Sequence, residues 1–351
     1  FDDSARLSLQ QGEVGSILNL PAALPGPNPS PAVIVEAANA VQRMAVNESR
    51  LGIPLLFGRD VIHGFRTVFP IPLAQAAAWN PALVEQGAEI AADEATSQGV
   101  KWTFAPMVDI ARDPRWGRVA EGAGEDPYLG SVIAAAAVRG FQGDDLSDPR
   151  RLLACAKHFV GYGGAEGGRD YESVEMSMRT LRDVYLPPYH AAVKQGVASL
   201  MAAFHDLNGI PLNAHRELLT DLLRSEWGFK GFVVSDWRSV IELVNHGIAA
   251  DPAEAAYAGL LAGVDMDMAS DVYRLHLPEL VADGHLAEEQ IHEAAPRILR
   301  LKFLAGLFEN PYTDPARHRT TLLQPENRQF ARQFKPPNGP AGPPPDNPPV
   351  R

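Results

Sequence analysis

The chain has 351 residues, 46% of them hydrophobic, which is enough for one large core or two ordinary domains. Its 31 basic and 43 acidic residues give a net charge of −12, which repels nucleic-acid phosphates and anionic lipid headgroups. We therefore expect neither nucleic acid nor a membrane among its partners. The single cysteine, Cys155, cannot form an internal disulfide, so the redox compartment stays open.

The location of the protein is weakly determined by the sequence. No apolar run approaches the roughly 20 residues that a membrane-spanning helix needs. The first residues, Phe1-Asp2-Asp3-Ser4, lack a basic region followed by an apolar stretch. Either no signal peptide existed or it has been removed, so we expect a periplasmic or secreted protein in the second case and a cytoplasmic one in the first.

Short β-rich runs alternate with longer segments of helical periodicity, which is typical of βα units around a parallel sheet. The expected strands cover residues 14–20, 54–60, 101–107, 153–159, 199–204, 232–236 and 263–268. The helices expected between them include 33–50, 81–98, 180–195, 216–227 and 253–262. These repeats favour an α/β fold, a (β/α)8 barrel of the TIM type with an irregular or incomplete first repeat. A doubly wound open sheet ranks second, because no glycine-rich dinucleotide fingerprint follows the first strand.

Polar residues gather where the predicted strands end. Those at or just past a C-terminal strand end are Asp60, Lys157, His158, His205, Asp236 and Asp265. One such aspartate alone is more often a helix cap or a turn residue. Several at one end of a barrel indicate an active site, because barrel enzymes build their chemistry on that rim.

Motifs in a fixed order then point to a family. They are Ser49-Arg50-Leu51-Gly52-Ile53-Pro54, Asp60-Val61-Ile62-His63-Gly64, Asp113-Pro114-Arg115-Trp116-Gly117-Arg118 with Gly124-Glu125-Asp126-Pro127, Lys157-His158-Phe159, and Gly228-Phe229-Lys230-Gly231-Phe232-Val233-Val234-Ser235-Asp236-Trp237. From about residue 9 to residue 325 the chain resembles glycoside hydrolase family 3, the β-glucosidase and β-xylosidase family. It is most similar there to bacterial β-glucosidases that cleave terminal, non-reducing β-linked glucose from cello-oligosaccharides and aryl glucosides.

The resemblance implies a retaining β-glycosidase with Asp236 as its nucleophile. Such an enzyme needs one carboxylate to form a glycosyl-enzyme and a second carboxyl group, about 5 Å away, to protonate the leaving oxygen. Nearby cations such as Lys157 are expected to keep Asp236 ionised against the effect of burial. The implied reaction needs no metal and no cofactor, and the chain is compatible with a homo-oligomer.

Sugar recognition requires groups that hydrogen-bond hydroxyls in pairs. By resemblance the positions that grip the terminal sugar are Asp60, Arg118, Lys157, His158 and Arg169, with Arg66 as a further addition. Asp60 accepts from adjacent hydroxyls, whereas Lys157 and Arg118 donate, so together they define one ring orientation. Trp237 either stacks on the apolar face of the sugar or packs as an ordinary aromatic residue.

Some residues depart from the family pattern. Phe204 stands where many relatives have tyrosine, His205 where asparagine is more frequent, and Arg238 where a glycine is expected. Without a hydroxyl, Phe204 cannot hydrogen-bond the nucleophile. The loop after the Lys-His-Phe motif lacks the histidine of the Asp-His dyad found in some members, which disfavours an N-acetylhexosaminidase-like mechanism.

The end of the chain raises the question of the general acid. We expect a catalytic barrel over residues 1–310, a linker-like segment over 311–334 and a flexible tail over 335–351, which holds eight of the thirty prolines. The α/β sandwich domain that follows in most members is not expected here, although relatives with this loop take their acid from it. Local substitutes are Glu166, Asp170 and Glu172.

Two other interpretations remain open besides a β-glucosidase or a β-xylosidase. Lys157 could act as the nucleophile of a Schiff-base barrel enzyme, if it were desolvated at its strand end. Alternatively, the chain could bind a sugar with weak or no activity because it lacks its general acid.

Overall fold

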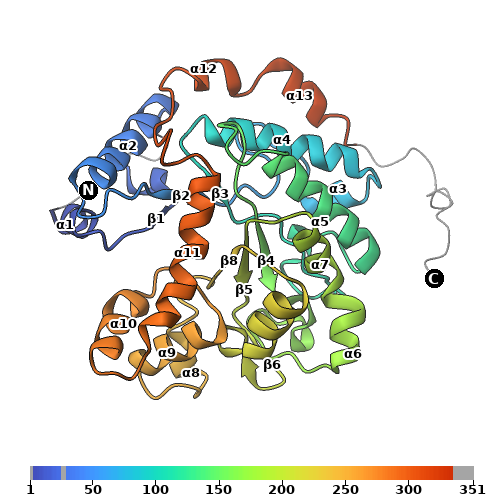
Figure 1. Ribbon diagram of the computed structural model, residues 1–351. Coiled ribbons are helices and arrows are strands. Elements are labelled where there is room, and N and C mark those ends of the chain that lie inside the picture. The colour runs from blue at the N-terminus through green and yellow to red at the C-terminus, as the bar shows by residue number, and fades with distance from the viewer. Residues whose placement is uncertain (1–2, 25–28, 335–351) are drawn as a thin grey trace.

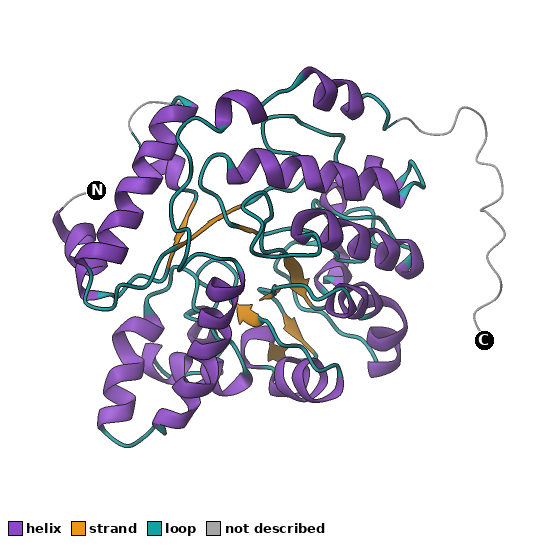
Figure 2. Ribbon diagram, turned by 45° about the horizontal axis from the view of Figure 1, so that its top comes forward, coloured by secondary structure: helices purple, strands orange, loops and turns teal. Residues whose placement is uncertain are grey.

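The computed structural model describes residues 3–24 and 29–334, and the proline-rich tail expected at 335–351 lies outside the described residues. The protein has a mixed α/β architecture in which the strands lie near the middle and helices surround them (Figures 1 and 2). Among the helices of the described ranges, none has the length and apolar character needed to cross a membrane.

The central strands are parallel. β1 (Ser16–Leu18), β2 (Leu56–Arg59) and β3 (Trp102–Thr103) form one sheet in that order, and β4 (Cys155–Phe159), β5 (Ser199–Ala202) and β8 (Phe232–Val234) form a second. Parallel bridges from Trp102 to Leu153 and from Met107 to Lys157 connect the two sheets. A further parallel bridge joins Val234 to Met266, so the predicted strands follow one another side by side in chain order.

The helices lie mainly between these strands along the chain. The α-helices are α1 (Asp3–Gln11), α2 (Pro31–Arg43), α3 (Pro72–Ala76), α4 (Pro81–Thr96), α5 (Pro127–Gln142), α6 (Met178–Thr180), α7 (Pro187–Lys194), α8 (Glu242–Asn245), α9 (Pro252–Ala262), α10 (Val272–Ala282), α11 (Glu288–Leu304), α12 (His318–Thr321) and α13 (Pro325–Ala331). Shorter or wider helical segments are η1 (Leu20–Ala23), η2 (Met44–Glu48), η3 (Val119–Glu121), η4 (Tyr162–Gly164), η5 (Glu166–Gly168), η6 (Leu181–Tyr185), η7 (Leu212–Ala214) and η8 (Glu217–Glu226).

Two helix starts show why these segments begin where they do. The Asn80 side chain accepts a hydrogen bond from the Ala82 amide, and Asp251 accepts one from the Glu254 amide. A proline occupies the first helical position in both α4 and α9, where its missing N–H costs nothing. The capping residues expected from the sequence are therefore confirmed.

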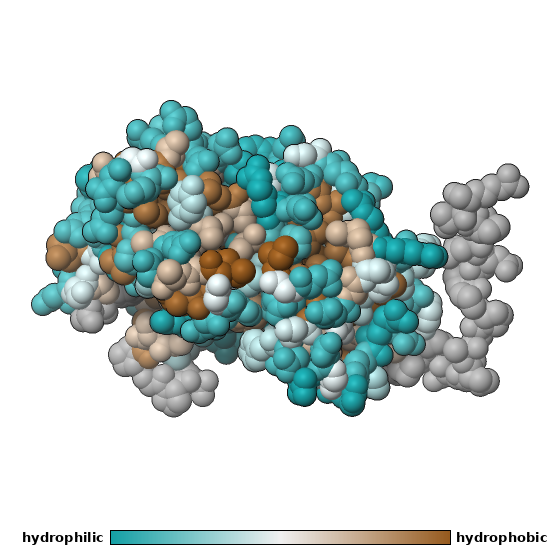
Figure 3. All heavy atoms as spheres, turned by 90° about the horizontal axis from the view of Figure 1, so that it is seen from below, coloured by the Kyte–Doolittle hydropathy of each residue, from teal (hydrophilic) through white to brown (hydrophobic). Residues whose placement is uncertain are grey.

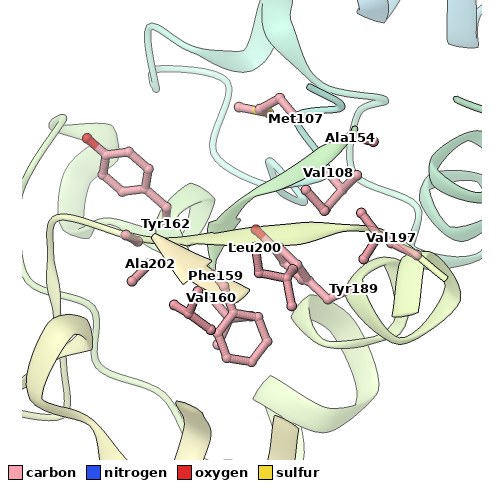
Figure 4. Packing of buried hydrophobic residues seen from close by; sticks show 14 of the residues in the cluster. Met107, Val108, Ala154, Phe159, Val160, Tyr162, Tyr189, Val197, Leu200 and Ala202 are labelled. Carbon is pink, nitrogen blue, oxygen red and sulfur yellow. The ribbon is translucent and has the colours of Figure 1, made fainter. Parts of the chain in front are cut away.

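Alternate residues along each strand enter different apolar clusters. In β8, Phe232 and Val234 join one cluster with Trp102 of β3, while Val233 packs into the larger cluster beneath the helices. β5 divides in the same way, with Met201 on the first side and Leu200 on the second. Part of the larger cluster is drawn in Figure 4. Both faces of the strands are thus buried, as their continuous apolar sequences indicate.

The structure changes several element boundaries. The expected strand 263–268 is reduced to the single bridge at Met266, and the expected helix 180–195 is divided into α6, η6 and α7. A short antiparallel pair, β6 (Asp206–Leu207) and β7 (Ile210–Pro211), was not predicted. Its turn contains Asn208 and Gly209, both with positive φ, which is the usual chemistry of a tight hairpin.

The segment 311–334 is not linker-like, and that expectation is corrected. It forms α12 and α13, which run along one edge of the molecule toward α4 (Figure 1). Phe330 and Phe334 are buried and join the larger apolar cluster, where their ring centroids lie 6.0 Å and 5.6 Å from that of Phe69. The two buried phenylalanines, not a long apolar run, hold this segment against the core.

Phe330→Ala should therefore destabilise the protein. Removing a buried phenylalanine leaves a cavity and costs about 3–5 kcal/mol. Urea unfolding would measure the change, with Tyr312→Ala as the control, since Tyr312 is half-exposed in the same segment and should cost less than about 1 kcal/mol. Equal stability of Phe330→Ala and the wild type would show that 311–334 contributes nothing to the folded core.

Candidate active site

An open cavity of about 570 Å³ lies at the carboxyl ends of the parallel strands. Its wall includes most of the polar residues expected there: Asp60, Arg118, Lys157, His158, Asp236 and Trp237. These come from the end of β2, the loop before η3, β4 and the residues after β8. Side chains separated by up to 177 positions in the sequence, from Asp60 to Trp237, are brought together because parallel strands share one C-terminal edge.

Asp236 is fixed at this edge by its neighbours. Its Oδ1 accepts a hydrogen bond of 2.6 Å from the Trp237 amide, and its backbone carbonyl accepts from the hydroxyls of Ser235 and Ser239. The residue is 9% exposed. Burial raises the pKa of the Asp236 carboxyl, while the Trp237 N–H and the cations Lys157 and Arg118 act in the opposite direction. The carboxylate is thus positioned and partly desolvated, as a nucleophile requires.

His158 lies between two carboxyl groups. Its Nδ1 is 2.8 Å from Asp109 Oδ2, and its Nε2 is 3.6 Å from Asp236 Oδ2. Burial lowers the pKa of His158 to about 3, so the ring is neutral at neutral pH. A neutral ring that donates from Nδ1 to Asp109 presents its other nitrogen to the cavity as an acceptor.

Two ion pairs form opposite parts of the wall. Lys157 Nζ donates to Asp60 Oδ1 at 2.7 Å, and Arg118 makes a two-pronged contact with Glu121 at 2.7 Å and 3.0 Å. Burial alone would raise the pKa of Glu121, but the paired guanidinium lowers it below its ordinary value. The cavity therefore carries fixed donors and acceptors side by side, which suits ligands that present neighbouring hydroxyls.

Aromatic side chains line the more open part of the cavity. Trp237 and Tyr171 belong to its wall and are 56% and 60% exposed, which is unusual for residues of this size. Phe204 also lines it and packs edge-on against Tyr171, with ring centroids 5.1 Å apart. Exposed aromatic faces beside fixed polar groups are the usual surroundings of a sugar ring.

Two of the expected binding residues lie outside this wall. Arg66 is exposed and its guanidinium lies over the Phe65 ring, 6.0 Å from the centroid. Arg169 is 67% exposed at its side chain and pairs with Glu172 at 3.0 Å. Neither residue lines the cavity, and both are exposed to solvent.

The residues that depart from the family pattern also have definite places. His205 is buried and stacks on Tyr162 with an interplanar angle of 6°, so it lies behind the wall. Arg238 has a φ of 57°, a left-handed conformation that glycine adopts freely. The glycine expected there thus has a backbone reason, and arginine holds the conformation through its amide, which donates to the Met268 carbonyl at 2.8 Å.

Other residues of the wall were not predicted. They are Arg59, Glu121, Met201 and Met268, together with Leu18, Asn19 and Phe104. Glu121 could have been found, because it follows Arg118 by three positions, a spacing that pairs opposite charges on a helical turn. Asp265 was expected at the rim but is buried between Arg224 and Arg297, where it links η8 to α11.

Metal binding receives no support from the described part of the chain. Within residues 3–24 and 29–334, no group of three or more His, Cys, Asp or Glu side chains is arranged to hold a metal ion. Two cations of the cavity wall are instead paired with carboxylates, Lys157 with Asp60 and Arg118 with Glu121.

Known proteins with similar sequences and structures share a family. The profile described as the glycosyl hydrolase family 3 N terminal domain matches residues 1–301. A periplasmic β-glucosidase of Salmonella typhimurium is 41% identical, over 89% of this chain and 39% of that protein. A putative β-xylosidase of Formosa agariphila is 39% identical, over 83% of this chain and 39% of that protein.

The structural comparison agrees. A β-glucosidase of Listeria innocua, solved in complex with glucose, superposes with a TM-score of 0.84 at 42% identity, over 91% of this chain and 43% of that one. The chain thus spans about two fifths of the length of the curated relatives that it matches. A profile match over residues 1–301 and relatives at about 40% identity lead to one conclusion: the chain belongs to glycosyl hydrolase family 3.

Proposed function

We propose that this chain carries the nucleophile and the sugar-binding subsite of a retaining β-glycosidase, with a terminal β-D-glucosyl residue as its preferred substrate. The observation that carries the proposal is the buried Asp236 carboxylate at the end of β8, facing a cavity walled by paired charges. In the first step Asp236 attacks the anomeric carbon and the glycosidic bond to the leaving oxygen breaks. Water then attacks the same carbon, the bond to Asp236 breaks, and the proton that the water loses balances the negative charge on the departed oxygen, so that the free sugar and the carboxylate are released.

The same proposal includes a closed barrel. Residues from successive strands fill one apolar cluster: Leu18, Leu56, Trp102, Cys155, Met201, Phe232, Val234 and Met266. Side chains from every strand of a sheet meet in one place when the sheet curves back on itself. This supports a (β/α)8 arrangement with the cavity at its C-terminal end, where barrel enzymes carry their active sites.

The wall suits a hydroxyl-rich ligand better than a carbonyl substrate. A Schiff-base lysine needs an apolar pocket or a second cation that holds its amine neutral. Lys157 instead donates to Asp60 at 2.7 Å, an arrangement that holds an ammonium group and fixes it as a donor. Glucosides are preferred because relatives named β-glucosidases match this chain, and β-xylosides are the second candidate because relatives named β-xylosidases match it as well.

The source of the proton for the leaving group is a separate question. Besides Asp236, the described carboxylates in the wall are Asp60, Glu121 and Asp170. Each faces a donor: Asp60 the Lys157 ammonium, Glu121 the Arg118 guanidinium and Asp170 the Trp116 indole N–H. Of the loop carboxylates considered from the sequence, Glu166 and Glu172 do not line the cavity. A carboxylate held by a donor is poorly arranged to give up a proton, so residues 3–24 and 29–334 present a nucleophile without a partner acid in the cavity wall.

The nucleophile can be identified by trapping. A 2-deoxy-2-fluoro-β-glucoside with a dinitrophenyl leaving group should label Asp236, because the fluorine slows release of the glycosyl-enzyme. Peptide mass mapping would locate the label. Asp236→Asn should lose both labelling and turnover, while Asp183→Asn, an exposed carboxylate 64% accessible at its side chain, should keep both. A label on any other carboxylate would overturn the assignment.

The Lys157–Asp60 pair should contribute strongly to binding of the transition state. Hydrogen bonds to charged groups contribute about 1.5–3 kcal/mol each, so Lys157→Ala and Asp60→Ala should each lower kcat/KM on nitrophenyl β-glucoside by roughly 10- to 150-fold. Because the two side chains contact each other, the double variant should lose less than the sum of the two. Arg182→Ala, which breaks an exposed ion pair, serves as the control. Wild-type kcat/KM in either cavity variant would remove that residue from the subsite.

The rate of hydrolysis by this chain should depend strongly on the leaving group of the substrate. Nitrophenolate departs with little protonation, whereas the alkoxide released from cellobiose needs a proton. We expect kcat/KM on nitrophenyl glucoside to exceed that on cellobiose by about three orders of magnitude, the usual scale of acid catalysis, and azide to accelerate release of the sugar.

Ordinary cellobiose hydrolysis that is insensitive to azide and to protein concentration would contradict this expectation. Asp170→Asn would then be the first variant to examine, with Glu166→Gln and Glu172→Gln as controls on the same loop. A panel of aryl β-glucosides and β-xylosides, compared by kcat/KM, distinguishes the two substrate candidates.

A further inference from the structure

Behind the cavity wall lies a buried polar group that no step of the proposed reaction uses. It consists of Asp109, which follows the bridge residue Met107, and Tyr189 of α7, which is drawn among the packed side chains of Figure 4. Asp109 is 2% exposed, and Tyr189 is fully buried. Neither residue lines the cavity, yet both contact His158, which does.

Four short contacts join the three residues. Asp109 Oδ2 accepts from the His158 amide at 3.0 Å and lies 2.8 Å from His158 Nδ1. The Tyr189 hydroxyl oxygen lies 2.7 Å from Asp109 Oδ1 and 2.6 Å from the His158 carbonyl oxygen. His158 is thus held at its amide, its carbonyl and its ring by two buried side chains.

The two contacts of the tyrosine need two protons, and the hydroxyl has only one. The His158 carbonyl can only accept, so the phenol proton serves that contact. The remaining contact, between the phenol oxygen and Asp109 Oδ1, then requires a proton on the aspartate. Without it, two oxygen atoms would face each other at 2.7 Å in a site that water does not reach, which is costly.

We propose that in mildly acidic solution Asp109 is a neutral carboxylic acid, donating to Tyr189, which donates to the His158 carbonyl, and that this chain of hydrogen bonds positions His158 beside Asp236. Asp109 and Tyr189 are thus positioning residues. Their effect on catalysis rests on the reaction proposed above. The proton count itself rests on the buried contacts alone.

The surroundings of Asp109 are consistent with a carboxyl group that loses its proton near neutral pH. Burial raises the pKa of Asp109 to about 6, against the lowering effect of its contacts with Tyr189 and His158 and of the nearby Arg118 and His205. Around Tyr189 the further titratable group is Cys155, whose thiol is also kept neutral by burial, with a pKa of about 12.

The direction of the pH dependence follows from linkage. The folded-state pKa lies above the ordinary carboxyl value of about 3.8, so the folded protein holds this proton where the unfolded chain has lost it. The stabilisation is therefore present in acid and is lost as the pH rises through about 6. Above that pH the chain of hydrogen bonds lacks a proton, and His158 should be held less well.

Asp109→Asn tests the proton directly, because a carboxamide imitates the neutral acid. Its oxygen accepts from the His158 amide and ring, and its NH2 donates to Tyr189. We expect kcat/KM within about threefold of wild type at pH 5.5, and a smaller decline than wild type between pH 5.5 and 8. Asp109→Ala, which removes the contacts, should lose about 100-fold at every pH, the scale of a displaced catalytic group.

Stability gives a readout that does not depend on activity. The melting temperature of Asp109→Asn relative to wild type should increase between pH 5 and pH 8, since only the wild type has a proton to lose. A constant difference, with Asp109→Asn as damaging as Asp109→Ala, would show that Asp109 is ionised and overturn the proposal. If the wild type were inactive on every glycoside, the proposed function would fail while the melting data would still decide the proton.

Tyr189→Phe provides a second variant if the asparagine substitution does not fold. It should lower kcat/KM about tenfold at pH 5.5, because one buried hydrogen bond is lost. The ratio of wild-type to variant kcat/KM should be smaller at pH 8, where Asp109 of the wild type has lost the proton that it shares with Tyr189. Tyr185→Phe, a neighbouring buried tyrosine outside this group, is the matched control and should show no such pH dependence. An equal gap at both pH values for Tyr189→Phe would contradict the shared proton.

Discussion

Burial of both faces of the parallel strands is the constraint on which the rest of the structure depends. Along β4, β5 and β8 every side chain is buried, so a polar side chain within a strand must find a partner or lie where the strand ends. Lys157 and His158 satisfy this requirement through Asp60 and Asp109. The same requirement places Asp236 two residues beyond β8, where its carboxylate reaches the cavity. The site is thus a consequence of how the sheet is packed.

Charge pairing across the cavity wall gives the site its chemical character. Asp60 and Lys157 come from different strands, and Arg118 and Glu121 come from one helical turn, so each cation is neutralised by a neighbour. Fixed donors and acceptors of this kind can orient a ligand that presents neighbouring hydroxyls. Asp236, in contrast, has no single cation bonded to its carboxylate among the described residues and keeps only the Trp237 N–H at 2.6 Å. A carboxylate that is positioned but not neutralised is available to attack.

Behind that wall, buried side chains support the residues that line the cavity. Tyr162 lies under the Arg118 guanidinium, 5.6 Å from it, and meets the His158 ring edge-on with centroids 5.3 Å apart. Asp109 and Tyr189 hold the same histidine from its backbone side. Rigid, buried supports of this kind keep reacting groups in place without solvent reorganisation.

The face of the molecule shown in Figure 3 has apolar side chains gathered near its centre, surrounded by more hydrophilic ones.

The sequence by itself determined the class of fold, most element positions and the family. Alternation of apolar runs with helical periodicity placed β2, β4, β5 and β8 within a few residues, because buried parallel strands leave continuous apolar signals. It could not determine that 311–334 packs through Phe330, since two buried rings in a polar segment have no periodic signal.

Tertiary structure alone decided which polar residues meet. Arg66 and Arg169, expected to bind the sugar, are exposed to solvent and do not line the cavity. Asp265, expected at the rim of the barrel, is buried and paired with Arg224 and Arg297. Glu121 and Asp109 carry no motif of their own and become part of the site through contacts with Arg118 and His158. The physical reason is that a strand end fixes where a backbone lies, whereas the direction and partner of a side chain depend on residues far away in the sequence.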